Sequence, residues 1–255
     1  MTGPNLPDVT LVAATGVAIE ATAEALTASL DQAAFGRALL LSPRRPSKSV
    51  DPRIEWRAIE SLSSRAAYSA FMLHRLHEYV TTSHALCVQW DGFVINGRGW
   101  DPGFLDYDYI GPVWPQFRDE HNVGNGGFSL RSRKLLLATR NLPYDGRAAE
   151  DVLIARTYRP KLESEGIRFA PAALARRFAY ERTAPVGGEF GFHGAFNLVK
   201  LRNQQQLLNL FATLERQVLN HDEHKELLRW AISRGYFKLA LLLVRRILRQ
   251  HRSTT

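Results

Sequence analysis

Strand-like and helix-like segments alternate over the first ninety residues, and this order constrains the fold more than any other feature. Short apolar segments bounded by turn residues predict strands at 9–14, 37–42, 54–58 and 85–89. Helical patterns lie between them, over residues 19–34 and 63–80. This alternation predicts an α/β fold whose parallel sheet is covered by helices on both faces. Such sheets bind ligands at the carboxyl ends of their strands, and Asp91 follows the fourth strand there.

The chain changes character near residue 200. Before that point, shorter strands are predicted at 107–111, 127–130 and 167–170, and helices at 131–139, 148–163 and 172–178. After it, helical patterns dominate, beginning with residues 204–219. Asn220 and Glu223 form a capping box for a second helix, and Gly235 separates that helix from a third. We therefore expect one domain over residues 1–199 and a basic helical C-terminal region over residues 200–255.

The composition of the chain limits the cellular compartment and the kind of partner that we expect for it. The single cysteine, Cys87, has no intrachain partner, which indicates a buried thiol in a reducing compartment. The N-terminus has no basic stretch followed by an apolar one, and the run 239–244 is far shorter than the roughly 20 residues of a membrane span. These features predict a cytoplasmic protein. The net charge is +8, and eleven Lys/Arg against four Asp/Glu lie after residue 199, so the excess positive charge belongs to the C-terminal region. Because a protein that binds nucleic acid more often carries its basic surface on the main fold, we expect no nucleic-acid partner.

Two glycine-containing segments suggest a site at the sheet edge. Asp91, in Gln89-Trp90-Asp91-Gly92, can bind a hard cation such as Mn²⁺ or Mg²⁺ that neutralises a diphosphate. The alternative is a turn-forming Asp before Gly, which is common at strand ends. The segment Gly124-Asn125-Gly126-Gly127 allows a ligand to approach the backbone closely, and a hairpin turn explains it equally well.

The other two segments supply titratable groups. Glu150 and Asp151 open a predicted helix, where carboxylates meet the positive end of the helix dipole. In a functional reading, Asp151 removes a proton from an acceptor hydroxyl, with Glu150 as its neighbour or as an acceptor-binding group. His193, between Phe192 and Gly194, is either a metal ligand or a hydrogen-bonded structural residue.

In this order the segments resemble the motifs of GT-A-fold glycosyltransferases. Gln89-Trp90-Asp91 is similar to their Asp-any-Asp metal motif, with Gln89 in place of the first Asp. The string GNGGFSLRS resembles their glycine loop, Ala149-Glu150-Asp151 their acidic motif, and His193 their C-terminal metal-ligand histidine. Together with QWDGFVIN, DYDYIGPVW and FGFHG, these strings resemble a bacterial GT-A-related family whose members are mostly uncharacterised. The resemblance covers residues 8–198.

The resemblance implies a GT-A-like fold and transfer of a sugar from a nucleotide-diphosphate donor to a glycan or lipid-linked acceptor, as in polysaccharide biosynthesis. Asp91 and His193 would bind Mn²⁺ or Mg²⁺, and Asp151 would act as the base in an inverting reaction. Because Gln89 brings no charge, a metal-independent variant is the alternative. The remaining implied residues are donor-binding Ala13, Ala14, Thr15, Gln89, Trp90, Asp91, Gly126 and Gly127, and acceptor-binding Trp114 and Phe117.

The last helical segment, YFKLALLLVRRILRQHR, combines an apolar block with clustered arginines. Packing on the preceding helices with solvated arginines explains it, and the alternative is contact with an acidic membrane surface or a partner helix. A peripheral position on the inner face of the membrane would then be possible. A rival for the whole chain is a non-catalytic GT-A-like binding or assembly module that acts through this basic tail.

Overall fold

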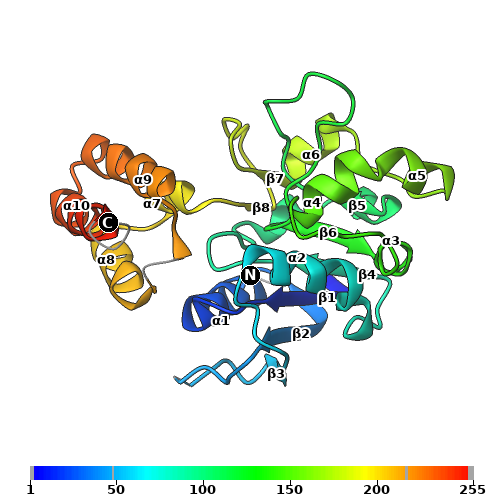
Figure 1. The fold of residues 1–255 in the computed structure, drawn as a ribbon, viewed down its shortest axis with the longest axis horizontal. Coiled ribbons are helices and arrows are strands. Elements are labelled where there is room, and N and C mark those ends of the chain that lie inside the picture. The colour runs from blue at the N-terminus through cyan, green and yellow to red at the C-terminus, as the bar shows by residue number, and fades with distance from the viewer. Residues whose placement is uncertain (1–2, 48, 216–217, 252–255) are drawn as a thin grey trace. The chain divides into compact units, whose positions relative to one another are not determined.

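The computed structural model describes residues 3–47, 49–215 and 218–251, and the chain divides into two compact units. The first unit ends at His193 and the second begins at Gly194. Figure 1 shows the elements of both units, which are described separately below.

A six-stranded sheet with the order β3-β2-β1-β4-β6-β5 forms the centre of the first unit. Four neighbouring strands, β3, β2, β1 and β4, are parallel, whereas β6 is antiparallel to both β4 and β5. A separate parallel pair joins β7 to β8. The strands are β1 (Asn5–Ala14), β2 (Ala34–Ser42), β3 (Glu55–Ala58), β4 (His84–Cys87), β5 (Tyr109–Ile110), β6 (Ser129–Ser132), β7 (Ala179–Tyr180) and β8 (Gly191–Phe192).

Helices cover this sheet on both faces, which confirms the expected α/β class, and the sheet is mixed and mainly parallel. The longer ones are α1 (Ile19–Leu30), α2 (Arg65–His74), α3 (Arg133–Thr139), α5 (Arg159–Ser164) and α6 (Ala172–Phe178). Shorter helical turns are η1 (Leu76–Glu78), η2 (Gly97–Gly99), η3 (Pro102–Asp106), α4 (Glu150–Val152) and the π-helical η4 (Leu153–Thr157). Ser64 begins α2 by accepting a hydrogen bond from the N–H of Ala67, as an N-cap serine does.

Alternation along β1 divides the core between the two faces of the sheet. Leu11 and Ala13 point to the face covered by α1 and α6, where they join Leu26 and Phe178 in one apolar cluster. The intervening Val12 belongs to a second cluster, which receives side chains from α2 and α3. The sheet is therefore the middle layer of three, as its uninterrupted apolar strands require.

Several elements differ from the sequence-based expectation; for example, the predicted helix 63–80 is divided into α2 and η1. Strand β1 begins at Asn5 rather than residue 9, because Pro7 lies in a register irregularity that hides the strand pattern. The predicted strand 167–170 is reduced to one bridge between Phe169 and Tyr109. The predicted helix 148–163 is three segments, α4, η4 and α5, and Pro160 lies in the first turn of the last of them.

The second unit is helical. It contains η5 (Ala195–Asn197), α7 (Leu198–Leu201), α8 (Gln204–Thr213), α9 (His221–Ser233) and α10 (Phe237–His251). The expected capping box is present at α9, where Asn220 and Glu223 bond each other's backbone N–H groups, and Gly235 has a left-handed φ of 70° just before α10. Within the residues that the structure describes, no helix is both long enough and apolar enough to span a bilayer.

Candidate active site

The segment after β4 is a tight turn that carries Asp91 at its tip. Gln89 and Gly92 exchange backbone hydrogen bonds of 3.0 and 3.1 Å, which leaves Trp90 and Asp91 as the two loop residues. Asp91 is thus a turn residue, as the structural alternative expects, and it is also buried at the carboxyl end of β4. The turn carries its carboxylate into the interior of the unit rather than into solvent.

His193 faces this turn from a distant part of the chain. Val94 bridges to Gly191, and the His193 N–H donates to the Tyr180 carbonyl, so β8 is fixed beside the turn. The imidazole Nε2 lies 3.6 Å from Asp91 Oδ1 and 3.3 Å from the Gln89 amide oxygen. Side chains from two distant segments, the turn 89–92 and His193, therefore meet at one point.

The other ring nitrogen of His193 faces a second carboxylate. Its Nδ1 lies 3.2 Å from Glu181 Oε1, and the Asn125 amide nitrogen approaches it to 3.1 Å. Burial alone lowers the pKa of His193, but Asp91 and Glu181 outweigh this effect and raise it to about 9. The ring is therefore protonated on both nitrogens at neutral pH. A cation at Nε2 would replace one of these protons, because a ligating imidazole must be neutral.

The glycine loop provides space for other side chains of the site. A Cβ atom on Gly127 would lie 2.0 Å from His193 Nε2, and one on Gly126 would lie 2.1 Å from Glu150 Oε1. Their backbone N–H groups are also used, Gly127 donating to Asn125 Oδ1 and Gly126 to Asp151 Oδ2. Asn125 has a left-handed φ of 69°. The sequence predicts close approach of a ligand here, whereas the structure fills both positions with protein groups.

The acidic pair has two different environments. Asp151 is partly exposed, and its two oxygens accept hydrogen bonds from the N–H groups of Gly126 and Val152. Glu150 is buried and forms an ion pair of 2.9 Å with Arg131 Nη2. Burial, reinforced by the Asp151 carboxylate, raises the pKa of Glu150 against the opposing effect of Arg131. Of the two acids, Asp151 alone has a carboxylate within reach of solvent.

Arg131, Glu181 and Asn125 belong to the candidate site, although the sequence predicts no role for them. Arg131 is fully buried, and besides Glu150 it contacts the hydroxyl of Ser129 and the carbonyl of Gly126. Its presence in a strand otherwise formed by small and apolar residues was the available signal, since a buried arginine needs a carboxylate partner. Glu181, in a polar segment, gave no such signal.

A divalent cation fits the donor atoms of this cluster. Asp91 Oδ1, Gln89 Oε1 and His193 Nε2 are mostly oxygen donors with one imidazole, which suits Mn²⁺. The described residues contain no group of three or more His, Cys, Asp and Glu side chains able to hold a metal. Because Gln89 is neutral, a cation here needs further oxygen ligands from a bound diphosphate.

One protein family matches residues 53–193, and its description reads "Protein of unknown function (DUF5672)". The chain belongs to this family. The match ends at His193, the last residue of the first unit, and contains every member of the cluster from Gln89 to His193. The family segment therefore holds the whole candidate site, while Ala13 to Thr15 and the second unit lie outside it.

Solved structures similar to this chain include a mannosyltransferase. No curated protein matches the chain. The mannosyltransferase PcManGT from Pyrobaculum calidifontis, solved in complex with GDP-Man and Mn²⁺, is similar with a TM-score of 0.43 and 13% identity. The similarity covers 95% of this chain and 86% of that chain. A likeness at this level carries no weight for activity.

The predicted donor-binding residues outside the family segment lie at the end of β1. Ala13, Ala14 and Thr15 are buried there, and Val12 pairs with Cys87 of β4, so this end adjoins the turn that carries Asp91. The Thr15 hydroxyl bonds the Val17 carbonyl. These residues share the sheet edge with the cluster, as the parallel topology requires.

The predicted acceptor-binding aromatics are largely covered by protein. Trp114 is buried, and a Cβ on Gly124 would lie 2.2 Å from its ring. Phe117 packs against Trp114 at 5.6 Å between centroids, and the Arg156 guanidinium lies 4.1 Å from the centroid of the Phe117 ring. Trp90 is likewise buried. The contacts of Trp114 and Phe117 are those of a wall that supports the glycine loop.

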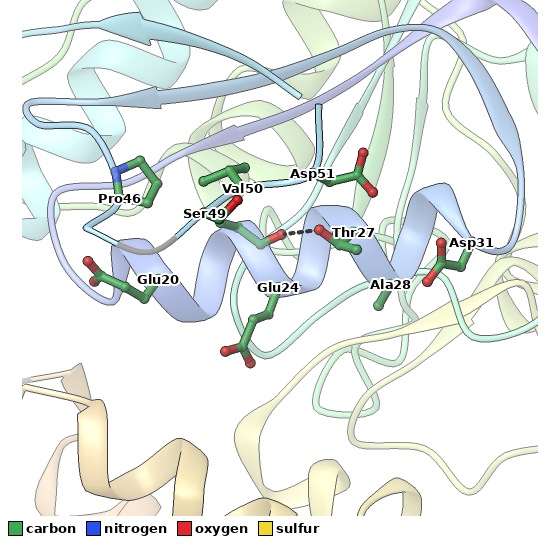
Figure 2. Close-up of a pocket in the computed structure, with 10 residues that line it drawn as sticks. Glu20, Glu24, Thr27, Ala28, Asp31, Pro46, Ser49, Val50 and Asp51 are labelled. Atoms are coloured by element: carbon green, nitrogen blue, oxygen red, sulfur yellow. Dashed lines mark hydrogen bonds between the residues drawn. The ribbon is translucent and has the colours of Figure 1, made fainter. Parts of the chain in front are cut away.

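A separate hollow of about 300 Å³ lies beside α1, outside the family segment (Figure 2). Carboxylates at Glu20, Glu24, Asp31 and Asp51 line it. Three of them are already paired, Glu20 with Arg44, and Asp31 and Asp51 with Arg53. This hollow is formed by ion pairs that fasten the segment 44–53 to α1, and it shares no residue with the cluster around His193.

Proposed function

We propose that this protein is a GT-A-like glycosyltransferase, which moves a sugar from a nucleotide-diphosphate donor to a glycan or lipid-linked acceptor. The observation that carries the proposal is the approach of His193 Nε2 to Asp91, at 3.6 Å, and to Gln89, at 3.3 Å, beside the glycine loop that also anchors Asp151. A cation-binding group beside a partly exposed carboxylate is what transfer from a diphosphate requires.

In this proposal Asp151 is the base. Its carboxylate takes the proton of the acceptor hydroxyl while that oxygen bonds the anomeric carbon of the sugar. The bond from this carbon to the phosphate oxygen breaks, the nucleoside diphosphate leaves with the electron pair, and the anomeric configuration inverts. Hydrogen bonds from the N–H groups of Gly126 and Val152 fix the direction of the Asp151 carboxylate. Glu150 positions the loop through Arg131.

Asp91 and His193, with Gln89, would hold Mn²⁺ or Mg²⁺. When bound, the cation supplies positive charge that stabilises the departing diphosphate. Glu181 holds the proton on His193 Nδ1, which leaves Nε2 directed at Asp91 and Gln89. Ala13, Ala14, Thr15 and Trp90, at the same sheet edge, would form the wall of the nucleotide site.

A donor-hydrolysis screen tests the proposal. The full chain is incubated with UDP-, GDP-, CMP- and dTDP-sugars and Mn²⁺, and release of the nucleotide is measured. Asp151→Asn should lower transfer by roughly 10²- to 10⁴-fold, the usual contribution of a general base. Asp145→Asn is the matched control, because this exposed carboxylate lies outside the cluster and contacts only Arg147, accepting a hydrogen bond of 3.0 Å from its backbone N–H and lying 3.7 Å from its Nε. Equal loss of activity in both variants, or none in Asp151→Asn, would contradict the assigned role.

The second candidate is a non-catalytic binding module with the same fold. Two observations favour it: the glycine positions are filled by His193 and Glu150, and Gln89 supplies no charge. Calorimetry with nucleoside diphosphates and Mn²⁺ separates the candidates, because a pure assembly module gives no heat. Binding of a nucleoside diphosphate without hydrolysis of any sugar donor would indicate a module that retains only recognition.

A further inference from the structure

Helix α10 has two apolar faces, and one of them is exposed. Leu239, Ala240 and Leu243 are buried within the helical unit. The opposite face carries a second apolar row, here called the outer stripe. Its residues and exposed fractions are Phe237 at 71%, Leu241 at 54%, Val244 at 37% and Leu248 at 59%. Spacings of four, three and four residues place all of them on one side of the helix. A helix face that contacts only water has no need for a row of four apolar side chains.

Cations flank the outer stripe. Lys238 and Arg245 are both exposed, and they lie seven residues apart on the same side of the stripe. From residue 227 to the end, the sequence contains seven Lys/Arg and no Asp/Glu. Arg246 is different, because its guanidinium bonds the carbonyls of Phe211 and Leu214 and so anchors α10 to the α8 segment. The helix is thus held firmly on one side and presents apolar and cationic groups on the other.

We propose that the outer stripe docks α10 on an anionic phospholipid surface, with the helix axis in the plane of the interface. Apolar side chains would enter the boundary between headgroups and acyl chains, while Lys238 and Arg245 contact the headgroup phosphates. A helix with Phe and Leu on one face and Lys/Arg beside it has the composition of interfacial helices. This inference does not depend on the proposed reaction.

A second copy of the chain fits the stripe less well. The spacing is also that of a coiled-coil seam, in which Lys238 and Arg245 take the flanking position that normally pairs with acids. Their counterparts on the other flank, Ala240 and Ile247, offer no carboxylate. Stable protein interfaces use about 20–30 residues on each side, against four in the stripe. Charge and size therefore both favour a lipid surface.

Sedimentation with vesicles tests the inference on the full chain. Vesicles of phosphatidylcholine alone are compared with vesicles in which about one third of the lipid is phosphatidylglycerol. We expect binding to the anionic vesicles only, weakened by salt. Lys238→Gln with Arg245→Gln should reduce binding by roughly 20- to 30-fold, because each cation near such a surface contributes about five-fold. The control Arg147→Gln removes an exposed cation of the first unit and should bind normally.

Phe237→Gln with Leu241→Gln tests the apolar contribution. The pair should abolish sedimentation, whereas Val186→Gln, at an equally exposed apolar position of the first unit, should not. Circular dichroism checks that the variants remain helical. Equal binding to both vesicle types, or no binding, overturns the inference. Dimerisation that is lost in Leu241→Gln would overturn the inference and indicate a second copy as the partner. DNA binding that is unchanged in Leu241→Gln would overturn it and indicate nucleic acid as the partner.

Discussion

Replacing Arg131 with Met should destabilise the protein in a pH-dependent way. The Arg131 guanidinium is fully buried, 2.9 Å from Glu150 Oε1, so its loss leaves a buried carboxylate without its cation. Removing one partner of such a pair costs about 3–5 kcal/mol. Typical domains have about 5–15 kcal/mol of stability in total, so the variant should fold but with a clearly lower unfolding midpoint.

Without Arg131, Glu150 either remains a buried charge or takes up a proton, and the pH dependence follows because protonation costs less free energy. Without Arg131, the carboxyl group escapes the cost of a buried charge by taking up a proton. From its ordinary pKa of 4.5, this costs about 3.4 kcal/mol at pH 7 and about 0.7 kcal/mol at pH 5. A raised pKa in the folded state gives stability that is present at low pH and lost as the pH rises. The difference from the parent protein should therefore shrink between pH 7 and pH 5, by at most about 2–3 kcal/mol, because the pKa of Glu150 is already raised in the parent.

Urea unfolding at both pH values measures this difference, and Arg131→Met with Glu150→Gln is the control. The double variant has no buried charge, so it should be more stable than Arg131→Met at pH 7 and should not show the extra pH dependence. A loss below about 1 kcal/mol for Arg131→Met would refute the reasoning, since it would mean that Glu150 is well solvated without its partner. A loss of equal size at pH 5 and pH 7 would refute it as well.

Three further outcomes are expected. Gly127→Ala should weaken Mn²⁺ and nucleotide binding in calorimetry, because its Cβ would lie 2.0 Å from His193 Nε2 and ordinary contact begins at 3.4 Å, so the ring must move by roughly 1.4 Å; unchanged binding would count against His193 as a ligand. Asn220→Ala should lower the stability of the helical unit by about 0.5–2 kcal/mol in thermal unfolding, because the N-cap of α9 is lost. Burial lowers the pKa of His84 despite its hydrogen bond to the Tyr107 carbonyl. The parent protein should therefore lose stability relative to His84→Gln as the pH falls below 6.5. The same pH dependence of the free energy of unfolding in both proteins would contradict this.

The sequence predicts the layered fold well because the decisive pattern is local. Buried strands such as β4 and the capped helices starting at Ser64 and Asn220 are visible as apolar runs and cap residues. Strand 167–170 fails for the opposite reason, since pairing is a property of two segments and only Phe169 finds a partner. The π-helical turn in η4 has no pattern of its own in a single sequence.

The candidate site divides in the same way. Asp91, Asp151 and His193 are found from their motifs, and their roles remain predictions. The sequence does not predict Glu181 as a site residue, because its contact with His193 Nδ1 depends on the pairing of β7 with β8. These two-residue strands are too short to predict. The sequence predicts that Gly126 and Gly127 make room for a ligand, whereas in the structure they make room for Glu150 and His193. A sequence does not reveal which neighbour fills the space beside a glycine.

The packing of Gly126 and Gly127 against Glu150 and His193 has an evolutionary consequence. Any larger residue in the loop displaces a buried ion pair or an imidazole bonded on both sides, so purifying selection for foldability alone would preserve these four positions. A descendant that had abandoned its chemistry would still inherit an intact-looking motif. Within this family, retention of the motif and retention of turnover must therefore be measured as separate traits.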